Sequence, residues 1–199
     1  MKTEQVRSAK WEETRLRILS KADELFRQYG FMKTTIADIA HDLGMSTANI
    51  YKFFPSRSAL VESCAERNVS FMQSEIAVII GQRGSAMNRM RQCILKIFHF
   101  HEELFRNERQ IFKLVVEAIE EGWPCIQKFD EFLLENFTRL VREGVATKEF
   151  SSTQPAKTAS VLLDCLAIAL HPHMRHGRID VSDEIRINAM MTILGKALR

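Results

Sequence analysis

The chain has 199 residues and a formal net charge of +3; 46% of its residues are apolar, with 8 glycines and 4 prolines. This composition is typical of a folded, mainly helical protein with enough material for a large core. The sequence has no apolar run long enough for a membrane span, and its charged start lacks the apolar core of a secretory signal. We therefore expect a cytoplasmic protein that has no membrane partner.

The first helix is predicted from Trp11 to Tyr29. Its inward positions recur every three or four residues, as on one helix face, and Gly30 can end it. The predicted core residues of this helix are Ile18, Ala22, Leu25 and Phe26. Residues 1–10 are predicted to form a flexible arm. Such arms can enter a minor groove of DNA, but charged, disordered termini are commoner.

A helix with clear start and stop signals is predicted over residues 36–43. Thr35 precedes it, and Asp38 stands three positions later, which is the spacing of a capping box. The apolar positions Ile39 and Leu43 lie four apart on one face. Gly44 then supplies the positive φ that ends a helix. These signals define one short helix followed directly by a turn.

A second, shorter helix is predicted over residues 47–54. Ser46 can cap its start, Ile50 and Phe54 are its inward positions, and Pro55 stops it. A helix, a glycine-containing turn and a second helix form the helix-turn-helix of DNA-binding proteins. In that motif the second helix lies in the major groove and reads bases from its N-terminal residues.

The segment that contains these two helices resembles the tetracycline-repressor (TetR) family of bacterial transcription regulators. The positions that fit the family pattern are Thr34, Thr35, Ile36, Ile39, Ala40, Leu43, Gly44, Met45, Ser46, Ile50, Tyr51, Phe54, Arg57 and Leu60. Two positions depart from it, because Arg57 stands where Lys is usual and Phe53 where His is common. Arg keeps the charge, so the first departure leaves the interpretation intact. The resemblance covers roughly residues 11–60.

The resemblance implies a helix-turn-helix DNA-binding domain over residues 1–57 and a helical regulatory domain for ligand binding and dimerisation over residues 58–199. It further implies a homodimer that represses from a double-stranded DNA operator until a small, apolar, unidentified effector releases it. Charge agrees with this division. Residues 1–57 hold ten Lys and Arg against seven Asp and Glu, whereas the rest holds eighteen of each. A surplus of positive charge favours a polyanionic partner, although so small a surplus also arises by chance.

The outer face of the short helix carries most of the candidate DNA contacts. Its side chains are polar, small or aromatic, and such groups bond phosphates and base edges. The resemblance assigns phosphate contacts to Tyr51, Arg57 and Thr35, the last at a helix N-terminus. The candidate residues are Thr35, Ser46, Thr47, Ala48, Asn49, Tyr51, Lys52 and Arg57. The alternative interpretation is a solvated surface on a structural helix.

Six further helices complete an all-α prediction of about nine. A long helix begins near Ser56 and ends at the glycines of residues 81–85. The remaining five are predicted over residues 86–105, 108–121, 124–147, 155–171 and 182–198. Their limits are prolines, glycines and short polar runs, which either start or end helices.

The middle helices carry apolar, Phe-rich stripes interrupted by His101 and Asn136. Polar groups in an apolar lining are expected in a ligand pocket. A histidine of this kind is more often a satisfied core residue, and Phe clusters are more often plain packing, so an effector pocket follows mainly from the resemblance. The candidate ligand-binding residues are Ile97, Phe98, His101, Phe105, Phe112, Phe129, Leu133 and Asn136.

The last two predicted helices are apolar around most of their circumference. A surface helix would keep a polar half, so these two need cover from the core and from something else. In the family the pair meets its copy in a dimer interface. A dimer is also required to place two helix-turn-helix domains on a twofold-symmetric DNA site. The alternative is a monomer with a buried terminal hairpin.

Cysteines and histidines indicate neither disulfides nor a metal site. Four cysteines lie far apart in apolar helical settings, which predicts buried free thiols: Cys64, Cys93, Cys125 and Cys165. Three histidines lie around a proline without acidic or cysteine partners at ligand spacing: His171, His173 and His176.

We expect no enzymatic activity and no cofactor, because the sequence has no phosphate-binding glycine loop, no nucleophile elbow and no zinc-protease motif. Two alternatives to a ligand-released repressor stay open. One is a helical small-molecule-binding protein without DNA function. The other is an interaction protein that uses DNA as a scaffold.

Overall fold

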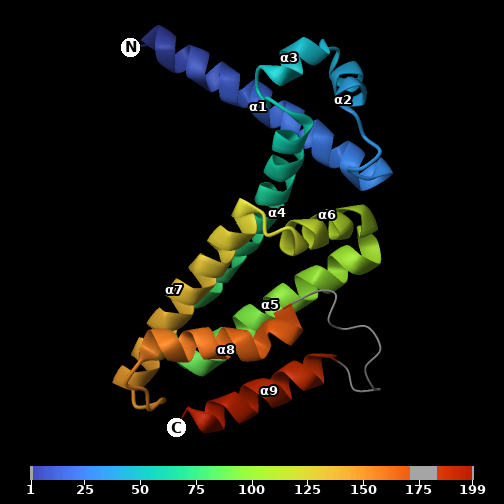
Figure 1. The fold of residues 1–199 in the computed structure, drawn as a ribbon. Helices are drawn as coiled ribbons and strands as arrows, with labels where there is room; N and C mark the ends of the chain where they lie inside the picture. Colours follow the sequence, from blue (N-terminus) through green and yellow to red (C-terminus); the bar gives the residue numbers. More distant parts are fainter. Residues whose placement is uncertain (1, 171–182, 199) are drawn as a thin grey trace. The chain divides into compact units, whose positions relative to one another are not determined.

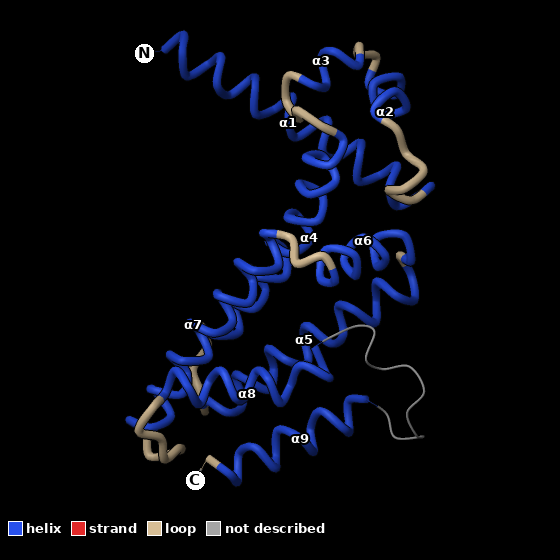
Figure 2. Tube along the Cα trace, viewed as in Figure 1, coloured by secondary structure: helices blue, strands red, loops and turns tan. Residues whose placement is uncertain are grey.

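The computed structural model describes residues 2–170 and 183–198, and this part of the chain is helical without strands (Figures 1 and 2). Its helices are α1 (Lys2–Tyr29), α2 (Ile36–Leu43), α3 (Thr47–Tyr51), α4 (Arg57–Ile80), α5 (Ala86–Asn107), α6 (Arg109–Glu120), α7 (Pro124–Ala146), α8 (Pro155–Leu170) and α9 (Asp183–Ala197). The all-α prediction is therefore confirmed. The ends of α5 to α9 lie within two residues of the predicted positions.

The predicted flexible arm is wrong for residues 2–10, which form the first turns of α1. The charge of this segment and its lack of an apolar face suggested disorder. However, it contains no Gly or Pro, and Lys, Glu, Gln, Arg and Ala are all good helix formers. Adding turns to a helix that has already formed avoids the cost of nucleation, so α1 continues through them.

The described residues belong to two compact units. One comprises those within Met1–Asn68 and Leu104–Cys125, and the other those within Val69–Glu103 and Ile126–Arg199. Since α4 and α5 cross these limits, each contributes residues to both units. The predicted domain division after residue 57 stays a prediction.

The first unit has a core shared by α1, α2 and α3, and α1 also contacts α6. The predicted inward residues are buried, as expected: Ile18, Ala22, Leu25, Phe26, Ile36, Ile39, Ile50 and Phe54. Leu43 is the exception, because it is only half-buried at the last position of α2, beside the exposed turn.

The second unit has a larger core built from α4, α5, α7, α8 and α9. Its fully buried side chains include Ile76 of α4, Ile94 of α5, Phe137 of α7 and Leu166 of α8, and Ile187 of α9 is also buried. Apolar area removed from water is the main stabilising term for such a core. The stripes predicted on α5 and α7 therefore do pack inward within this unit.

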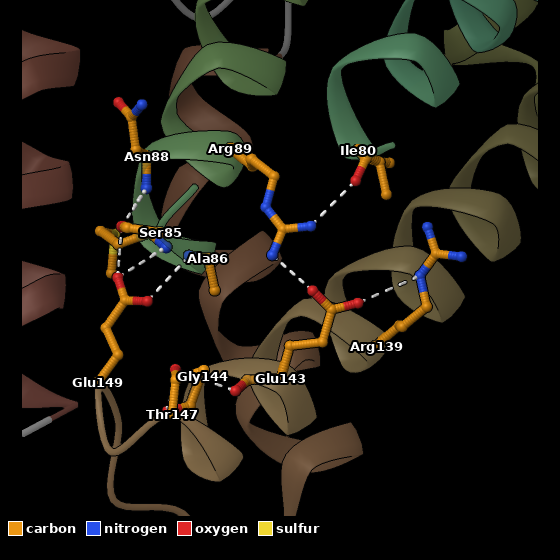
Figure 3. Close-up of polar contacts among 11 residues, drawn as sticks. Ile80, Ser85, Ala86, Asn88, Arg89, Arg139, Glu143, Gly144, Thr147 and Glu149 are labelled. Atoms are coloured by element: carbon orange, nitrogen blue, oxygen red, sulfur yellow. Dashed lines mark hydrogen bonds and ion pairs between the residues drawn. The ribbon is translucent and has the colours of Figure 1, made fainter. Parts of the chain in front are cut away.

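The N-terminus of α5 is capped by a carboxylate from far along the chain (Figure 3). Glu149 Oε2 accepts a hydrogen bond from Ala86 N at 2.8 Å, while Oε1 accepts from Ser85 Oγ at 2.6 Å and from Met87 N at 3.1 Å. Burial raises the pKa of Glu149, but these hydrogen bonds and the charge of Arg89 together outweigh burial. The pKa of Glu149 is consequently lowered.

Arg89 is a buried cation near the same helix end (Figure 3). Its Nη1 donates to the carbonyl of Ile80, the last residue of α4, at 3.0 Å, and its Nη2 forms an ion pair with Glu143 of α7. One side chain thus joins α5 to the ends of two other helices. Bonds to charged groups are stronger than neutral ones, which suits a position that is buried.

The structure corrects one prediction for the cysteines. Cys64, Cys93 and Cys125 are buried free thiols as predicted, whereas Cys165 of α8 is exposed. Burial raises the pKa of Cys64 and Cys93, the latter to about 12. The apolar residues around Cys165 in the sequence suggested burial, but neighbours in sequence do not determine which side of a helix meets the core.

The histidines at positions 171, 173 and 176 lie outside the described residues. Within residues 2–170 and 183–198, no cluster of three or more His, Cys, Asp or Glu side chains could hold a metal ion. In the same part of the chain, no helix is both long and apolar enough to cross a membrane.

Candidate DNA-binding interface

The predicted capping box is present at the start of α2. Asp38 N donates to Thr35 Oγ1 at 3.2 Å, and Thr35 N donates to Asp38 Oδ2 at 2.8 Å. The Thr35 hydroxyl also donates to Asp38 Oδ2 at 2.7 Å, and this side-chain bond is the largest cause of the lowered pKa of Asp38. The hydroxyl proton of Thr35 is thus already donated within the chain. The phosphate contact predicted for this residue stays a prediction.

The turn between α2 and α3 depends on Gly44. This residue has φ 63° and ψ 35°, the left-handed conformation that glycine adopts without a steric cost. Met45 N donates to Ala40 O at 2.8 Å, so the open carbonyls at the end of α2 are satisfied. Ser46 Oγ then accepts from Asn49 N at 3.2 Å and caps α3. The predicted sequence of helix end, turn and cap is confirmed.

The recognition helix α3 is shorter than predicted, ending at Tyr51 instead of residue 54. Phe53 N donates to Ile50 O at 2.9 Å, and Phe54 N donates to the same carbonyl at 3.1 Å. The cause is Pro55, whose ring disfavours helical geometry in the residue before it. Tight bonds to one carbonyl therefore replace the last predicted turn.

The two faces of α3 differ as the motif requires. Ile50 is fully buried and anchors the helix in the core of the first unit. The exposed predicted residues are Ser46, Thr47, Ala48, Tyr51 and Lys52, and Asn49 is half-buried. The polar outer surface is thus held on a fixed apolar base. Whether each of these side chains touches DNA stays a prediction.

Arg57 has a structural contact that the sequence did not reveal. Its Nε donates to Thr34 O at 3.2 Å, and its Nη2 donates to Phe31 O. Both carbonyls belong to the loop between α1 and α2, so Arg57 ties the start of α4 to this loop. A guanidinium has five N–H donors, so others are left for the predicted phosphate contact.

Sequence reasoning also missed an aromatic contact beside α3. The rings of Trp11 and Phe53 lie 5.1 Å apart between centroids, and the guanidinium of Arg15 lies 5.0 Å from the centre of the Phe54 ring. The available signal was the four-residue spacing of Trp11 and Arg15, which places both on one face of α1. Both residues lie within the predicted helix, but their spacing does not indicate that Phe53 and Phe54 pack against this face.

The candidate ligand-binding residues fall in both compact units. Phe105 and Phe112 lie in the first unit, where their rings meet edge to face at 5.2 Å. The others lie in the second unit: Ile97, Phe98, His101 and Leu133 are buried there, and Phe129 and Asn136 are half-buried. Asn136 Nδ2 donates to Phe132 O at 2.8 Å, one helical turn back. A shared effector pocket stays a prediction.

The terminal helices expose apolar side chains on one side each. On α8, Val161 is 51% exposed and Cys165 follows it by four positions, whereas Leu166 points into the chain's own core. On α9, Ile185 and Ile193 are 62% and 67% exposed, and eight positions separate them. Spacings of four and eight residues mark a single helix face. The expectation that both helices have apolar surface left over is therefore met in the described residues.

An all-helical chain in which a capped α2, a glycine turn and α3 present a polar helix surface is a helix-turn-helix protein, a class that binds DNA. Two family models match it: "Bacterial regulatory proteins, tetR family" over residues 18–64, and "Tetracyclin repressor-like, C-terminal domain" over residues 86–180. The chain belongs to the TetR family of bacterial transcription regulators.

Curated relatives are distant. Nucleoid occlusion factor SlmA of Mannheimia succiniciproducens is 29% identical over 90 residues, which are 45% of this chain and 42% of the relative. The chain thus spans less than half the length of this relative. The uncharacterised helix-turn-helix regulator YfiR of Bacillus subtilis is 25% identical over 152 residues, 71% of this chain and 70% of the relative.

Solved structures share the fold over almost the whole chain. A TetR/AcrR-family regulator from Thermobifida fusca has a TM-score of 0.69 at 22% identity, covering 94% of this chain and 99% of that one. RolR in complex with resorcinol has a TM-score of 0.64 at 16% identity, covering 96% and 90%. At these identities the likeness concerns the fold alone.

Proposed function

We propose that this protein is a cytoplasmic, homodimeric repressor that binds an operator through α3 and is released by a small apolar effector. The observation that carries the proposal is the exposed polar surface of α3, held on buried Ile50 and capped by Ser46. This surface can enter a major groove without burying an apolar anchor. The proposal assigns no catalytic step and no cofactor to the chain.

The residues of α3 divide into two roles. Tyr51 and Lys52 are exposed at its end and contact phosphates, which positions the helix without reading sequence. Asn49 lies in the first turn and reaches a base edge, where a good bidentate pair discriminates by about 1–3 kcal/mol. Thr47 and Ala48 complete the surface that meets the bases.

The test compares two variants on two duplexes at one fixed salt concentration. The specific duplex is selected from a random-sequence library by the wild-type protein, and a scrambled duplex of equal length serves as reference. Tyr51→Ala weakens binding to both duplexes to a similar degree, whereas Asn49→Ala mainly reduces the preference for the selected one. If Tyr51→Ala binds both as tightly as wild type while remaining folded, α3 is not in the groove.

The dimer rests on the exposed apolar faces of α8 and α9. Val161, Ile185 and Ile193 would be removed from water by a second copy, and a twofold assembly would pair two reading heads. In sedimentation, Ile193→Asp is expected to shift the dimer to monomer. Leu16→Asp, at an exposed apolar position of α1, is the matched control and keeps the dimer. A wild-type monomer at micromolar concentration contradicts this assembly.

Release from DNA by an effector requires that a movement of the regulatory helices reach the helix-turn-helix. The first unit contains contacts between α6 and α1 that can transmit such a movement. Arg27 of α1 forms an ion pair with Glu108, just before α6, and the Gln110 carboxamide packs against Gly30 at the end of α1. Gly30 has φ +90°, and an added Cβ would lie 2.8 Å from Gln110 Oε1. A movement of α6 therefore acts directly on the α1–α2 loop that Arg57 holds.

The effector can be tested with an apolar fluorescent probe, 1-anilinonaphthalene-8-sulfonate. Binding to the native state alone raises the melting temperature by mass action. If the predicted residues line a pocket, Ile97→Trp reduces both the fluorescence and the shift in melting temperature. An unchanged response in a folded Ile97→Trp variant would show that the probe does not bind beside Ile97.

A second candidate function is a DNA-scaffolded interaction protein. Two observations favour it: the partial similarity to nucleoid occlusion factors, and an exposed apolar face on α4. Phe71 and Val78 of that face are 56% and 65% exposed and lie seven positions apart. Mapping the chromosomal binding sites separates the candidates, because a repressor occupies few sites next to genes and a scaffolded protein occupies many dispersed ones.

A further inference from the structure

The first turns of α1 project past α3 and the turn into α4 (Figure 1). Their direction is fixed by two contacts to residues that follow α3. Trp11 packs against Phe53 at 5.1 Å between ring centroids, and the Arg15 guanidinium lies 5.0 Å from the Phe54 ring. Trp11 and Arg15 lie four positions apart, so the face of α1 that meets the end of α3 is defined.

Arg7 lies on that same face, four positions before Trp11 and eight before Arg15. Lys10 stands at its edge, three positions after Arg7. Both side chains are exposed, and no ion pair joins either of them to a side chain within residues 7–167 or 184–198, where the structure describes side chains. Two basic residues further along α1 are paired with carboxylates instead: Lys21 with Glu24 at 2.7 Å and Arg27 with Asp23 at 2.9 Å.

We infer that the N-terminal turns of α1 form a second DNA contact, in which Arg7 and Lys10 bind backbone phosphates beside the groove that α3 enters. The inference rests on the proposed function and extends it. A phosphate backbone is the proposed occupant because Arg7 and Lys10 are basic and exposed and stand within one helical turn of Trp11, which packs against Phe53, the residue that follows the exposed Tyr51 and Lys52. The contact carries no sequence information and adds to affinity on any duplex.

Trp11 is the positioning residue of this contact. The residue is 44% exposed, although a side chain of this size gains most from burial. Packing against Phe53 joins α1 to the segment that follows α3, so the turn of α1 that carries Arg7 and Lys10 is held in place before DNA arrives. Groups already held in the bound geometry lose less conformational entropy on binding.

The test is a salt titration of the full-length protein with a mixed-sequence 40-base-pair duplex, followed by fluorescence anisotropy. Each phosphate contact that is lost reduces the slope of log affinity against log salt by about 0.9. Arg7→Gln/Lys10→Gln is therefore expected to lower both affinity and slope. The matched control is Arg83→Gln/Lys113→Gln, which removes one exposed Arg and one exposed Lys outside residues 1–57 and leaves the slope near wild type.

The role of Trp11 is tested by a mutant cycle with Arg7 and Lys10. Trp11→Ala is expected to lower the slope although it removes no charge, and to add little in the Arg7→Gln/Lys10→Gln background, because coupled residues are not additive. Trp11→Phe keeps a ring against Phe53 and retains most of the wild-type slope. Circular dichroism melting verifies that each variant is folded.

The outcomes separate this contact from the proposed function. A wild-type slope for folded Arg7→Gln/Lys10→Gln, together with a reduced slope for Lys52→Gln, overturns the α1 contact and leaves DNA binding by α3 intact. An equal reduction in the Arg83→Gln/Lys113→Gln control also overturns it, since net charge alone then explains the effect. If wild type binds no duplex, the proposed function itself fails.

Discussion

The free N–H groups at the starts of α2 and α5 are satisfied by partners that lie at very different distances along the chain. Each helix start leaves N–H groups without a partner inside the helix. At α2 these groups are satisfied by Thr35 and Asp38, three positions apart. At α5 they are satisfied by Ser85 and by Glu149, which lies more than sixty positions away (Figure 3).

The difference has a consequence for how each region loses its structure. A local cap stabilises one helix and can be replaced without disturbing distant elements. The cap of α5, together with Arg89, connects the ends of α4, α5 and α7, so its loss reaches the packing of the whole second unit. The start of α2 thus depends on a local signal, whereas the start of α5 depends on a residue far along the chain.

The largest expected effect comes from Arg89. Arg89→Met removes its bonds to Ile80 O and Glu143 and is expected to destabilise the protein by about 2–3 kcal/mol, because buried groups that lose a charged partner are costly. Urea denaturation followed by circular dichroism measures the change. The control is Arg139→Gln, whose 3.9 Å pair with Glu143 is exposed and contributes little. Equal effects would show that the buried position of Arg89 is unimportant.

Glu149→Gln is expected to cost about 1 kcal/mol at neutral pH, the usual value of a helix cap. The cost depends on pH. Because the folded-state pKa of Glu149 is lowered, its contribution is fully present above the unfolded-state pKa and is lost as the pH falls through the folded-state pKa. The stabilities of wild type and variant should therefore converge in acid. A difference that stays constant between neutral and acidic pH contradicts a role for the charged carboxylate.

Thr35→Ala is expected to cost about 0.5–1 kcal/mol, since it removes only a local cap. Amide hydrogen exchange should show faster opening confined to α2 and its neighbours. The corresponding map for Glu149→Gln should extend over α4, α5 and α7. Identical maps for the two variants would remove the distinction between local and long-range caps.

The smallest expected effect belongs to the ion pair between Arg27 and Glu108. Both side chains are about one third exposed, so Glu108→Gln should change stability by about 0.5 kcal/mol or less. Its effect on the effector response should be larger than this small loss of stability explains, because the pair joins α1 to the residue before α6. The measurement is probe-dependent release from the selected duplex, with Glu12→Gln on the exposed surface of α1 as control.

The sequence alone determined the elements that depend on neighbours a few positions apart. The capping box of Thr35 and Asp38, the left-handed Gly44 and the inward Ile50 are all local requirements of backbone geometry and of the 3.6-residue period. The family followed from the same segment, because the helix-turn-helix places its residues at fixed local spacings. These are distances that a sequence displays directly.

Only the tertiary structure decided the features that join distant parts of the chain. It revealed Glu149 at the start of α5, the carbonyl partners of Arg57, the ring of Phe53 against Trp11, and the exposed side of α8 that carries Cys165. An apolar helix does not display in its sequence which side meets the core, and a surface glutamate does not display which helix end it reaches. Both depend on packing between elements, which is decided by the whole chain at once.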